Sequence, residues 1–308
     1  MRVLLTGASG FLGRHMLQCL RAHRIETIVL GRQANKLPTN IEVIEADLLG
    51  ETDLSTLTEK AQATHLLHFA WYAEHGKYWN SPLNLQWVDA TVRLTQAFCQ
   101  TGGKKVVMAG TCAEYDWSYG YCREDSTPQN PHTLYGAAKD ACRRLISAIC
   151  REHGIPIAWG RIFSPFGPGE HPQRLIPSLI RVLRGEAAPF GINASAYRDL
   201  LAASDAAEAF ISLLQADADG VFNICSGEPR QLGQVLCDLA RLLNGDPSPI
   251  LHLASSRPGE PHLLAGDNSR LCQLGWRPRL SFHEALQQLI EPSADTHNQF
   301  SSDKGATQ

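Results

Sequence analysis

Hydrophobic positions in the first half of the chain follow two alternating patterns. Short, near-continuous apolar runs, typical of buried strands, are separated by longer stretches in which apolar residues recur every three or four positions, as in helices. The expected strands are residues 3–6, 27–30, 42–44, 65–69, 105–109 and 155–160. The expected helices between them are residues 13–24, 85–99 and 133–152. This alternation predicts an α/β fold built on a doubly wound parallel sheet, covered by helices on both faces.

The pattern loosens from about residue 167, where proline and glycine interrupt it. Helices are expected at residues 173–184, 204–215 and 232–243, with short strands between them. We therefore expect a first domain over residues 1–165, to which later segments return, and a smaller α/β domain over residues 166–290. Residues 291–308 are polar and without periodicity, which predicts a disordered tail.

Composition narrows the class of protein. The chain has 308 residues, of which 44% are hydrophobic and 19% charged, and its formal net charge is −3. These values are typical of a soluble globular protein, and without a basic face they argue against nucleic-acid and anionic-membrane partners. Every apolar run is far shorter than the roughly 20 residues of a membrane span. The first residues lack the long apolar core of a signal peptide, so we expect a cytoplasmic protein.

Cysteine and histidine patterns give no sign of a metal site. The nine cysteines are scattered singly, without a C-x-x-C pair, as expected for reduced thiols in a cytoplasmic enzyme. No His/Cys cluster has the spacing of metal ligands.

A glycine-rich segment follows the first strand directly. Gly7, Gly10 and Gly13 form G-x-x-G-x-x-G between that strand and the first helix. Glycine permits the tight turn, lets backbone N–H groups approach a pyrophosphate, and directs the positive end of the helix at the anion. A purely structural turn is the alternative interpretation, which the position after the first strand makes less favourable. The segment therefore predicts a dinucleotide site.

The end of the second strand bears on the choice between NAD and NADP. A carboxylate at this place would hold the ribose 2′-hydroxyl of NAD, but the chain continues with Gly31 and Arg32. A guanidinium suits a 2′-phosphate, and Arg14 in the first helical turn is a second candidate. NADP(H) is favoured and NAD(H) stays possible, since Arg32 is alternatively a solvated loop charge.

Eight motifs then occur in a familiar order. They are TGASGFLG (6–13), ADL (46–48), HLLHFAW (65–71), AGTCAEY (109–115), YGAAK (135–139), RIFSPFGPG (161–169), RDLLAASDAAEA (198–209) and RPGEP…LGWRP (257–278). Over roughly residues 1–290 the chain resembles the extended short-chain dehydrogenase/reductases, the NAD-dependent epimerase/dehydratase family that acts on nucleotide sugars.

The resemblance implies a Rossmann-type dinucleotide domain, a smaller C-terminal substrate domain, and a nucleotide-diphosphate sugar bound between them. The residues implied at the cofactor are Gly7, Gly10, Phe11, Leu12, Gly13, Arg32, Asp47, Leu48, Phe69, Ala70, Trp71, Tyr135 and Lys139. Asp47 is expected at the adenine. Thr111 and Ser164 are expected at the sugar, and Arg198 and Arg257 at the diphosphate. Arg174 is either a further diphosphate ligand or a surface arginine at the start of a helix.

Tyr135 and Lys139 match the catalytic pair of that family. Four positions apart on a helix, they share one face, and we expect the ammonium to lower the pKa of the phenol. Tyr135 would then donate a proton to a carbonyl oxygen that Thr111 also hydrogen-bonds, while Lys139 holds the nicotinamide ribose. An accidental Tyr/Lys pair is the alternative, which the glycine loop and the motif order disfavour.

Some positions depart from the family pattern. Members that dehydrate sugars have Asp-Glu after the threonine, where this chain has Cys112 and Ala113, so a 4,6-dehydratase is disfavoured. Relatives that epimerise and then reduce have a cysteine at the position of Ala113, and Cys112 is expected to pack in the interior. Trp87 and Ser164 stand where many relatives have asparagine, so neither position offers the side-chain amide of those relatives.

The segment 71–82 has two interpretations. In the first, its aromatic residues stack on a base or sugar, and His75 and Lys77 bind phosphate. In the second, the loop packs on its own aromatic residues. His68, inside an apolar strand, is expected to be a buried, hydrogen-bonded core residue.

The leading functional hypothesis is the NADPH-dependent reduction of a nucleotide-linked 4-keto-6-deoxyhexose. A nucleotide-sugar 4-epimerase that retains NAD, a reductase of a non-sugar carbonyl and a non-catalytic NADP(H)-binding protein are the alternatives. By analogy with the family, the helices 85–99 and 133–152 predict a homodimer.

Overall fold

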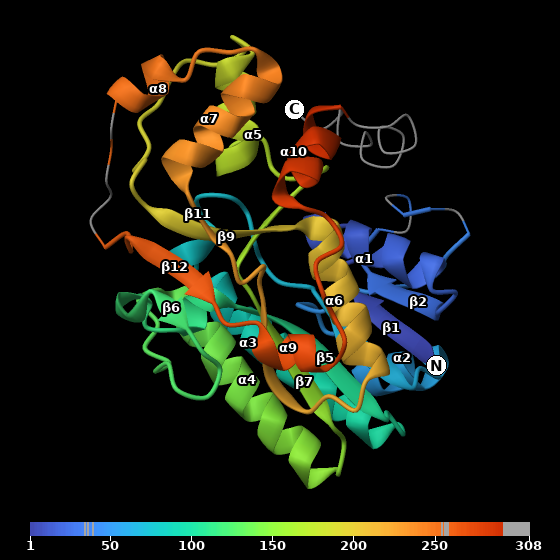
Figure 1. The fold of residues 1–308 in the computed structure, drawn as a ribbon. Coiled ribbons are helices and arrows are strands. Elements are labelled where there is room, and N and C mark those ends of the chain that lie inside the picture. Colours follow the sequence, from blue (N-terminus) through green and yellow to red (C-terminus); the bar gives the residue numbers. More distant parts are fainter. Residues whose placement is uncertain (34, 36, 39, 254, 256–258, 292–308) are drawn as a thin grey trace.

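A parallel sheet forms the larger part of the molecule. The computed structural model describes residues 1–33, 35, 37–38, 40–253, 255 and 259–291. Within these residues, seven parallel strands are arranged in the order β10-β7-β5-β4-β1-β2-β3 (Figure 1). They are β1 (Arg2–Thr6), β2 (Glu26–Gly31), β3 (Glu42–Glu45), β4 (His65–His68), β5 (Lys105–Thr111), β7 (Ile157–Ile162) and β10 (Gly220–Ile224). The predicted Rossmann-type sheet is confirmed.

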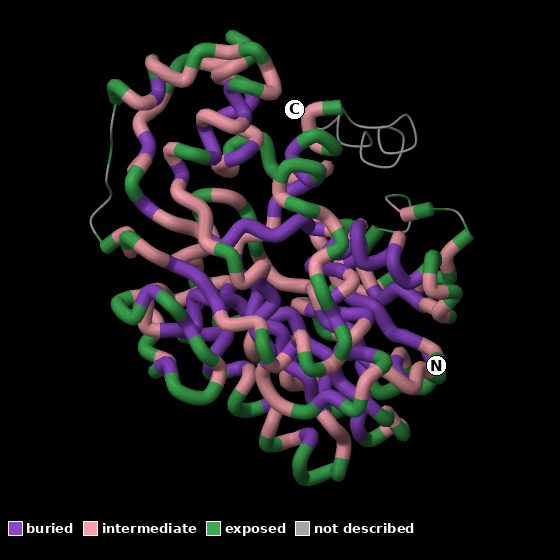
Figure 2. The backbone as a smooth tube through the Cα atoms, in the orientation of Figure 1, coloured by how far each residue is buried: buried purple, intermediate pink, exposed green. Residues whose placement is uncertain are grey.

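Helices cover both faces of this sheet, because its central strands are apolar on both sides. In β1, Val3 and Leu5 pack into one hydrophobic cluster and Leu4 into another. The first cluster includes residues of α1 (Phe11–Ala22) and α6 (Ala203–Gln215). The second includes residues of α2 (Leu54–Ala61), α3 (Leu83–Gln100) and α4 (Leu134–Glu152). Figure 2 shows this buried core along the strands.

A second, smaller sheet lies beside the ends of the first. Its strands are β6 (Tyr121–Cys122), β8 (Ser164–Phe166), β9 (Tyr197–Ala202), β11 (Pro229–Gln231) and β12 (Leu263–Gly266). The helices of this part are α5 (Leu175–Leu183), α7 (Leu232–Leu243), α8 (Ser248–His252), α9 (Ser269–Gln273) and α10 (Phe282–Ile290). In Figure 1, α5, α7 and α8 form the upper lobe. Most of this lobe shares a third hydrophobic cluster, which includes residues of α5, α7 and α10.

Several elements differ from the expected ones, including the helices α8, α9 and α10, which were not expected. The helix α2 was not expected, and the strand β5 continues to Thr111, two residues beyond the predicted end. The strand β10 follows the smaller sheet's β9 in the chain and returns to the first sheet, where it pairs with β7. The extension of β5 matters for the site, because it carries Thr111 to the edge where the parallel strands end.

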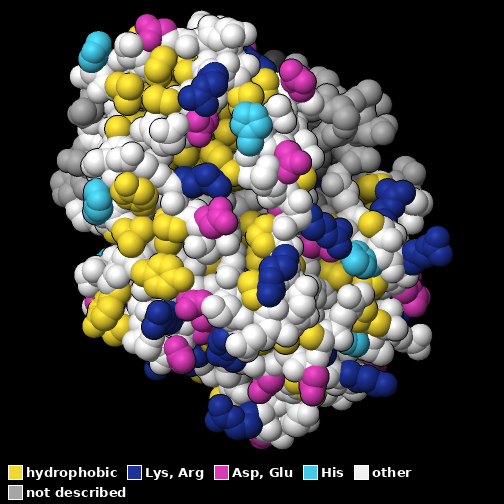
Figure 3. Space-filling view, in the orientation of Figure 1, with side chains coloured by type: hydrophobic (Ala, Val, Ile, Leu, Met, Phe, Trp, Pro, Cys, Tyr) yellow, Lys and Arg dark blue, Asp and Glu magenta, His cyan; other side chains and the backbone are white. Residues whose placement is uncertain are grey.

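No helix among the described residues is long and apolar enough to cross a lipid bilayer. Figure 3 shows acidic and basic side chains intermixed on one face of the molecule.

Candidate active site

A cleft of about 680 Å³ lies where the parallel strands end and the smaller sheet begins. Nearly all of the predicted site residues line it. They are Gly7, Gly10, Phe11, Leu12, Gly13, Arg32, Asp47, Leu48, Phe69, Ala70, Trp71, Thr111, Tyr135, Lys139, Ser164, Arg174 and Arg198. Arg257 lies outside the described residues. The fold therefore gathers into one cavity residues that are up to 191 positions apart in sequence, from Gly7 to Arg198.

The glycine loop forms the floor of one end of this cleft. Gly7 has a φ of +73°, and a Cβ added there would lie 2.6 Å from the backbone nitrogen of Ala70. A Cβ at Gly13 would lie 2.0 Å from the carbonyl oxygen of Gly7. Both positions therefore require glycine, since any side chain would push the loop away from β4 or from α1. The result is a loop that lies flat between strand and helix, as a pyrophosphate site requires.

Residues that follow β2 and β3 line the cleft beyond the glycine loop. Arg32 is exposed there, Leu48 is buried, and Asp47 accepts a hydrogen bond from the backbone N–H of Leu49 at 3.1 Å. Residues 31–33 contain no acid. The side chain that borders the cleft directly after β2 is thus a guanidinium.

Thr111 is held in place by a buried carboxylate that the sequence analysis missed. The backbone N–H of Thr111 donates to Glu114 Oε1 at 2.8 Å, and the threonine hydroxyl accepts from Ala113 N–H at 3.2 Å. Glu114 is fully buried and also accepts from Trp159 Nε1 at 2.9 Å and Arg161 Nε at 2.7 Å. The T-x-x-E spacing of a capping box was the signal in the sequence that reveals this contact.

Tyr135 lies in the first turn of α4 under a cover of aromatic rings. Tyr78 and Trp79 meet its ring edge-on, at centroid distances of 4.9 and 5.8 Å. Burial raises the pKa of the Tyr135 phenol above its ordinary value, Tyr78 adds to this effect, and a hydrogen bond with Thr111 opposes it. The expectation that Lys139 lowers this pKa is therefore wrong. At neutral pH the phenol keeps its proton.

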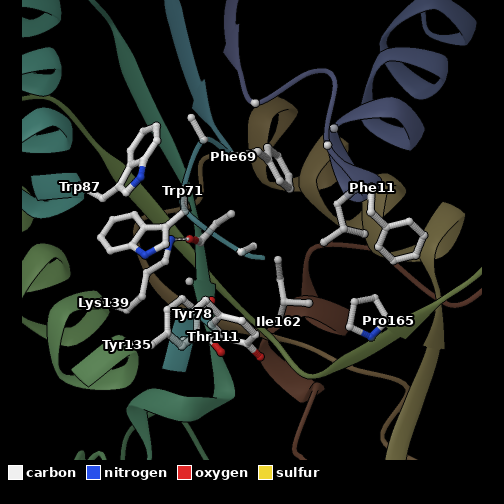
Figure 4. Close-up of a pocket in the computed structure, with 18 of the residues that line it drawn as sticks. Phe11, Phe69, Trp71, Tyr78, Trp87, Thr111, Tyr135, Lys139, Ile162 and Pro165 are labelled. Atoms are coloured by element: carbon white, nitrogen blue, oxygen red, sulfur yellow. Dashed lines mark hydrogen bonds between the residues drawn. The ribbon is translucent and has the colours of Figure 1, made fainter. Parts of the chain in front are cut away.

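The direction of the Lys139 side chain explains that correction. Its Nζ donates to the carbonyl oxygen of Ala109 at 2.9 Å and lies 3.9 Å from the ring centroid of Trp71 (Figure 4). Lys139 is almost fully buried, and burial lowers its pKa to about 8. Tyr135 and Lys139 thus share the cleft as predicted, but the ammonium contacts β5 and Trp71.

The two arginines at the other end of the cleft each pair with a carboxylate. Arg174 Nε lies 3.0 Å from Glu170 Oε1, and Arg198 Nη2 lies 2.7 Å from Glu260 Oε1. Ser164, at the start of β8, lines the same region. Both guanidinium groups border the cleft, but their charges are already partly compensated within the protein.

The segment 71–82 combines features of both interpretations. Tyr78 and Trp79 pack on one another at 4.4 Å and also line the cleft. His75 lines the cleft and stacks on His171 at 5.2 Å. Lys77 is exposed and pairs with Glu74. Trp117, which the sequence analysis did not single out, also lines the cleft, and its Nε1 donates to the carbonyl oxygen of Cys112 at 2.9 Å. Tyr78, Trp79 and Trp117 together are called the aromatic wall below.

His68, behind the cleft, and Cys112, which lines it, are packing residues. His68 is buried, and its ring nitrogens lie 2.8 and 3.1 Å from the hydroxyls of Thr6 and Thr91, so the predicted core role is confirmed. Cys112 is buried in a small hydrophobic cluster, and burial raises the pKa of its thiol. All nine cysteines are free thiols. The described residues contain no group of three or more metal-ligating side chains.

Comparison with known proteins finds a matching family and similar structures. A model of the NAD dependent epimerase/dehydratase family matches residues 3–225. The trifunctional UDP-glucose 4,6-dehydratase/UDP-4-keto-6-deoxy-D-glucose 3,5-epimerase/UDP-4-keto-L-rhamnose-reductase of Arabidopsis thaliana is 26% identical over 313 residues, which cover 94% of this chain and 46% of that protein. The chain therefore spans about half the length of this curated relative.

Solved structures are similar over nearly the whole chain. The UDP-glucose 4-epimerase of Thermus thermophilus, in complex with NAD, has a TM-score of 0.82 at 25% identity, covering 98% of this chain and 100% of that one. MoeE5, in complex with UDP-glucuronic acid and NAD, has a TM-score of 0.80 at 28% identity, covering 94% and 98%.

Proposed function

The chain belongs to the NAD dependent epimerase/dehydratase family, and from that premise we propose that it reduces a nucleotide-linked 4-keto-6-deoxyhexose to the 4-hydroxy sugar. The observation that carries this proposal is the meeting of Thr111, Tyr135 and Lys139 with a glycine loop in one cleft. The Arabidopsis relative, whose name includes a UDP-4-keto-L-rhamnose reductase, supports the choice of a 4-keto sugar.

The residues of the cleft suit proton donation to a carbonyl oxygen. A bound reduced nicotinamide supplies the hydride. Tyr135, kept neutral by burial, donates its proton to the oxygen as that atom becomes an alkoxide, which is a stronger base than a phenolate. The Thr111 hydroxyl hydrogen-bonds the same oxygen, and Glu114 fixes the backbone from which Thr111 projects. Lys139, whose ammonium lies at Ala109 and Trp71 within the same cleft, would bind the ribose of the nicotinamide.

We propose NADP(H) as the preferred cofactor, with NAD(H) as the alternative. The guanidinium of Arg32 beside the cleft, together with the missing acid at residues 31–33, supports a 2′-phosphate partner. The solved relatives named above are complexes with NAD, which is why both cofactors belong in the assay.

A 4-epimerase that retains its cofactor is the second candidate, favoured by the similarity to the Thermus thermophilus enzyme. The same three side chains serve oxidation and re-reduction equally well. Net consumption of reduced cofactor separates the two functions, since an epimerase shows none. A 4,6-dehydratase is disfavoured, because Cys112 and Ala113 stand where acid and base would be, and burial keeps the Cys112 thiol protonated.

The test mixes purified protein with NADPH or NADH and a panel of UDP-, dTDP-, GDP- and CDP-linked 4-keto-6-deoxyhexoses. Loss of cofactor absorbance and an NMR spectrum of the product identify the reduced sugar. Replacing Tyr135 by Phe removes the proton donor, so turnover should fall by about 100-fold or more while cofactor binding persists. Undiminished turnover in the Tyr135→Phe variant would remove Tyr135 from this role, and cofactor binding without any turnover would favour the non-catalytic alternative.

A further inference from the structure

The ammonium of Lys139 is buried beside a carbonyl oxygen and an aromatic ring. Among the residues that the structure describes, no Asp or Glu forms a salt bridge with it. Its hydrogen-bond partner is the carbonyl oxygen of Ala109, and its other close neighbour is the face of the Trp71 ring, 3.9 Å from Nζ. A buried cation in such surroundings tends to lose its proton unless something else stabilises the charge.

The ring of Trp71 is fixed independently of Lys139. Its Nε1 donates to Asn84 Oδ1 at 2.8 Å, and Asn84 is fully buried. The amide nitrogen of Asn84 in turn donates to the carbonyl oxygens of Tyr78 and Ser81 at 2.7 and 2.9 Å. Trp71 also stacks with Trp87, at 6.2 Å between centroids and 28° between planes. The indole is therefore a rigid surface at the end of β4.

The other ionisable groups around Lys139 supply little opposite charge at neutral pH. Burial lowers the pKa of His68, on β4, to about 3 and raises that of Cys142, on α4, to about 12, so both are neutral. Tyr135 is neutral as well. Glu114 attracts the ammonium only at longer range, and its carboxylate is already shared by Thr111, Trp159 and Arg161.

We propose that Trp71 is a positioning residue that keeps the Lys139 ammonium charged and in place through a cation–π contact, in the role that a carboxylate would otherwise fill. Tryptophan presents the most favourable ring face for a cation, and the contact is strongest where water is excluded. An ammonium has three N–H donors, and the ring face occupies no particular one of them. With one donor on Ala109, Lys139 keeps donors for the hydroxyl groups of a ligand or for Tyr135.

This inference rests on the proposed function for the role of Lys139, but its test measures the pKa of the lysine directly. Protein labelled with ¹³C at the lysine ε-carbons is titrated by NMR, and the Lys139 signal is assigned by its loss in Lys139→Arg. Trp71→Leu removes the ring, whereas Trp71→Phe keeps a smaller ring face and loses the hydrogen bond to Asn84. We expect the Lys139 pKa to fall by about one pH unit in Trp71→Leu and by less than half as much in Trp71→Phe.

An unchanged Lys139 pKa in Trp71→Leu overturns the inference, and so does an equal fall in both variants, which would assign the effect to the hydrogen bond. If Trp71→Leu does not fold, wild-type protein containing mono- and difluorinated tryptophan replaces it. Fluorine weakens the negative ring face at nearly constant shape, so the Lys139 pKa should fall with each added fluorine. No trend across that series would equally overturn the inference.

Turnover then separates this inference from the proposed function. If Lys139 must be charged for catalysis, the alkaline limb of the kcat profile moves to lower pH in Trp71→Leu, by the same amount as the NMR titration. A shifted titration in a protein that reduces no keto sugar leaves the contact established and refutes the reductase instead.

Discussion

Burial determines the charge of the ionisable side chains in the cleft more strongly than their neighbours do. It is the largest influence on Tyr135 and Lys139, and on Glu170, which pairs with the cleft residue Arg174; in each case it favours the neutral form. A neutral phenol suits a proton donor. A lysine whose pKa is about 8 is still mostly charged at pH 7, so small changes around it alter its charge in the physiological range.

Glu170 offers a direct measurement of this effect on stability. Its side chain is 4% exposed, one oxygen pairs with Arg174, and burial raises its pKa from 4.5 to about 7. An acid with a raised pKa in the folded state stabilises the fold at low pH, and this contribution is lost as the pH rises from about 4.5 through 7. The loss amounts to at most about 3 kcal/mol.

The variant Glu170→Gln cannot ionise and should escape this loss. The difference in unfolding free energy between variant and wild type should therefore shift in favour of the variant between pH 4.5 and 8, as measured by urea denaturation at several pH values. Glu59→Gln, at an exposed position on α2, serves as the control and should give a flat difference. A flat difference for Glu170→Gln as well would mean that Glu170 is ionised at no cost in the fold.

At the scale of elements, sequence periodicity was sufficient to predict the strands of the parallel sheet but not the long-range pairing between strands. The strands of the first half were predicted because their apolar runs are buried on both faces. Helix α2 was missed since its eight residues give too few turns for a clear period. The pairing of β10 with β7 is long-range, and no local pattern encodes it.

The same limit applies to side chains in the cleft. Spacing correctly placed Tyr135 and Lys139 on one helix. The direction of the ammonium, however, depends on Trp71, which follows β4, and on Ala109 in β5. Likewise, the pairing of Arg198 with Glu260 joins residues 62 positions apart. Roles that depend on one local motif were predictable, and those that depend on tertiary neighbours were not.

The segment between β4 and α3 contributes to the aromatic wall beside the proposed proton donor. Trp79, in its short 3₁₀ helix (Tyr78–Asn80), meets Tyr135 at 5.8 Å and Trp117 at 6.1 Å. If the apolar face of a deoxysugar packs here, Trp79→Leu should cost about 1 kcal/mol of binding, or a roughly fivefold higher KM for the nucleotide sugar. The KM for NADPH should not change.

Steady-state kinetics with each substrate varied in turn measures both constants. Tyr119→Leu is the matched control, because Tyr119 is 58% exposed and does not line the cleft. A Trp79→Leu variant whose KM for the sugar is unchanged would show that the wall packs only on itself.

At the scale of the whole molecule, the outer surface of α4 carries a stripe of exposed apolar residues. Four exposed apolar residues follow helical spacing along it, namely Ala137, Ala141, Leu145 and Ala148. Leu145 is 48% exposed, and α3, which packs beside α4, adds Leu85 at 59%. Small residues on a helix surface allow close approach of a second helix, and a contiguous apolar stripe on a soluble protein often marks an interface. We therefore propose a homodimer formed through α3 and α4.

The variant Leu145→Glu tests this dimer. In an interface between two copies of α4 it would bury two like charges near the symmetry axis, which costs several kcal/mol and should yield a monomer at micromolar concentration. Light scattering after size-exclusion chromatography measures the mass. Leu253→Glu is the control, because Leu253 is similarly exposed at 51% but follows α8 in the other lobe, and its mass should equal that of the wild type. A monomeric wild type, or a Leu145→Glu variant that remains dimeric, would rule out this interface; the cleft, which is lined within a single chain, would be unaffected by either result.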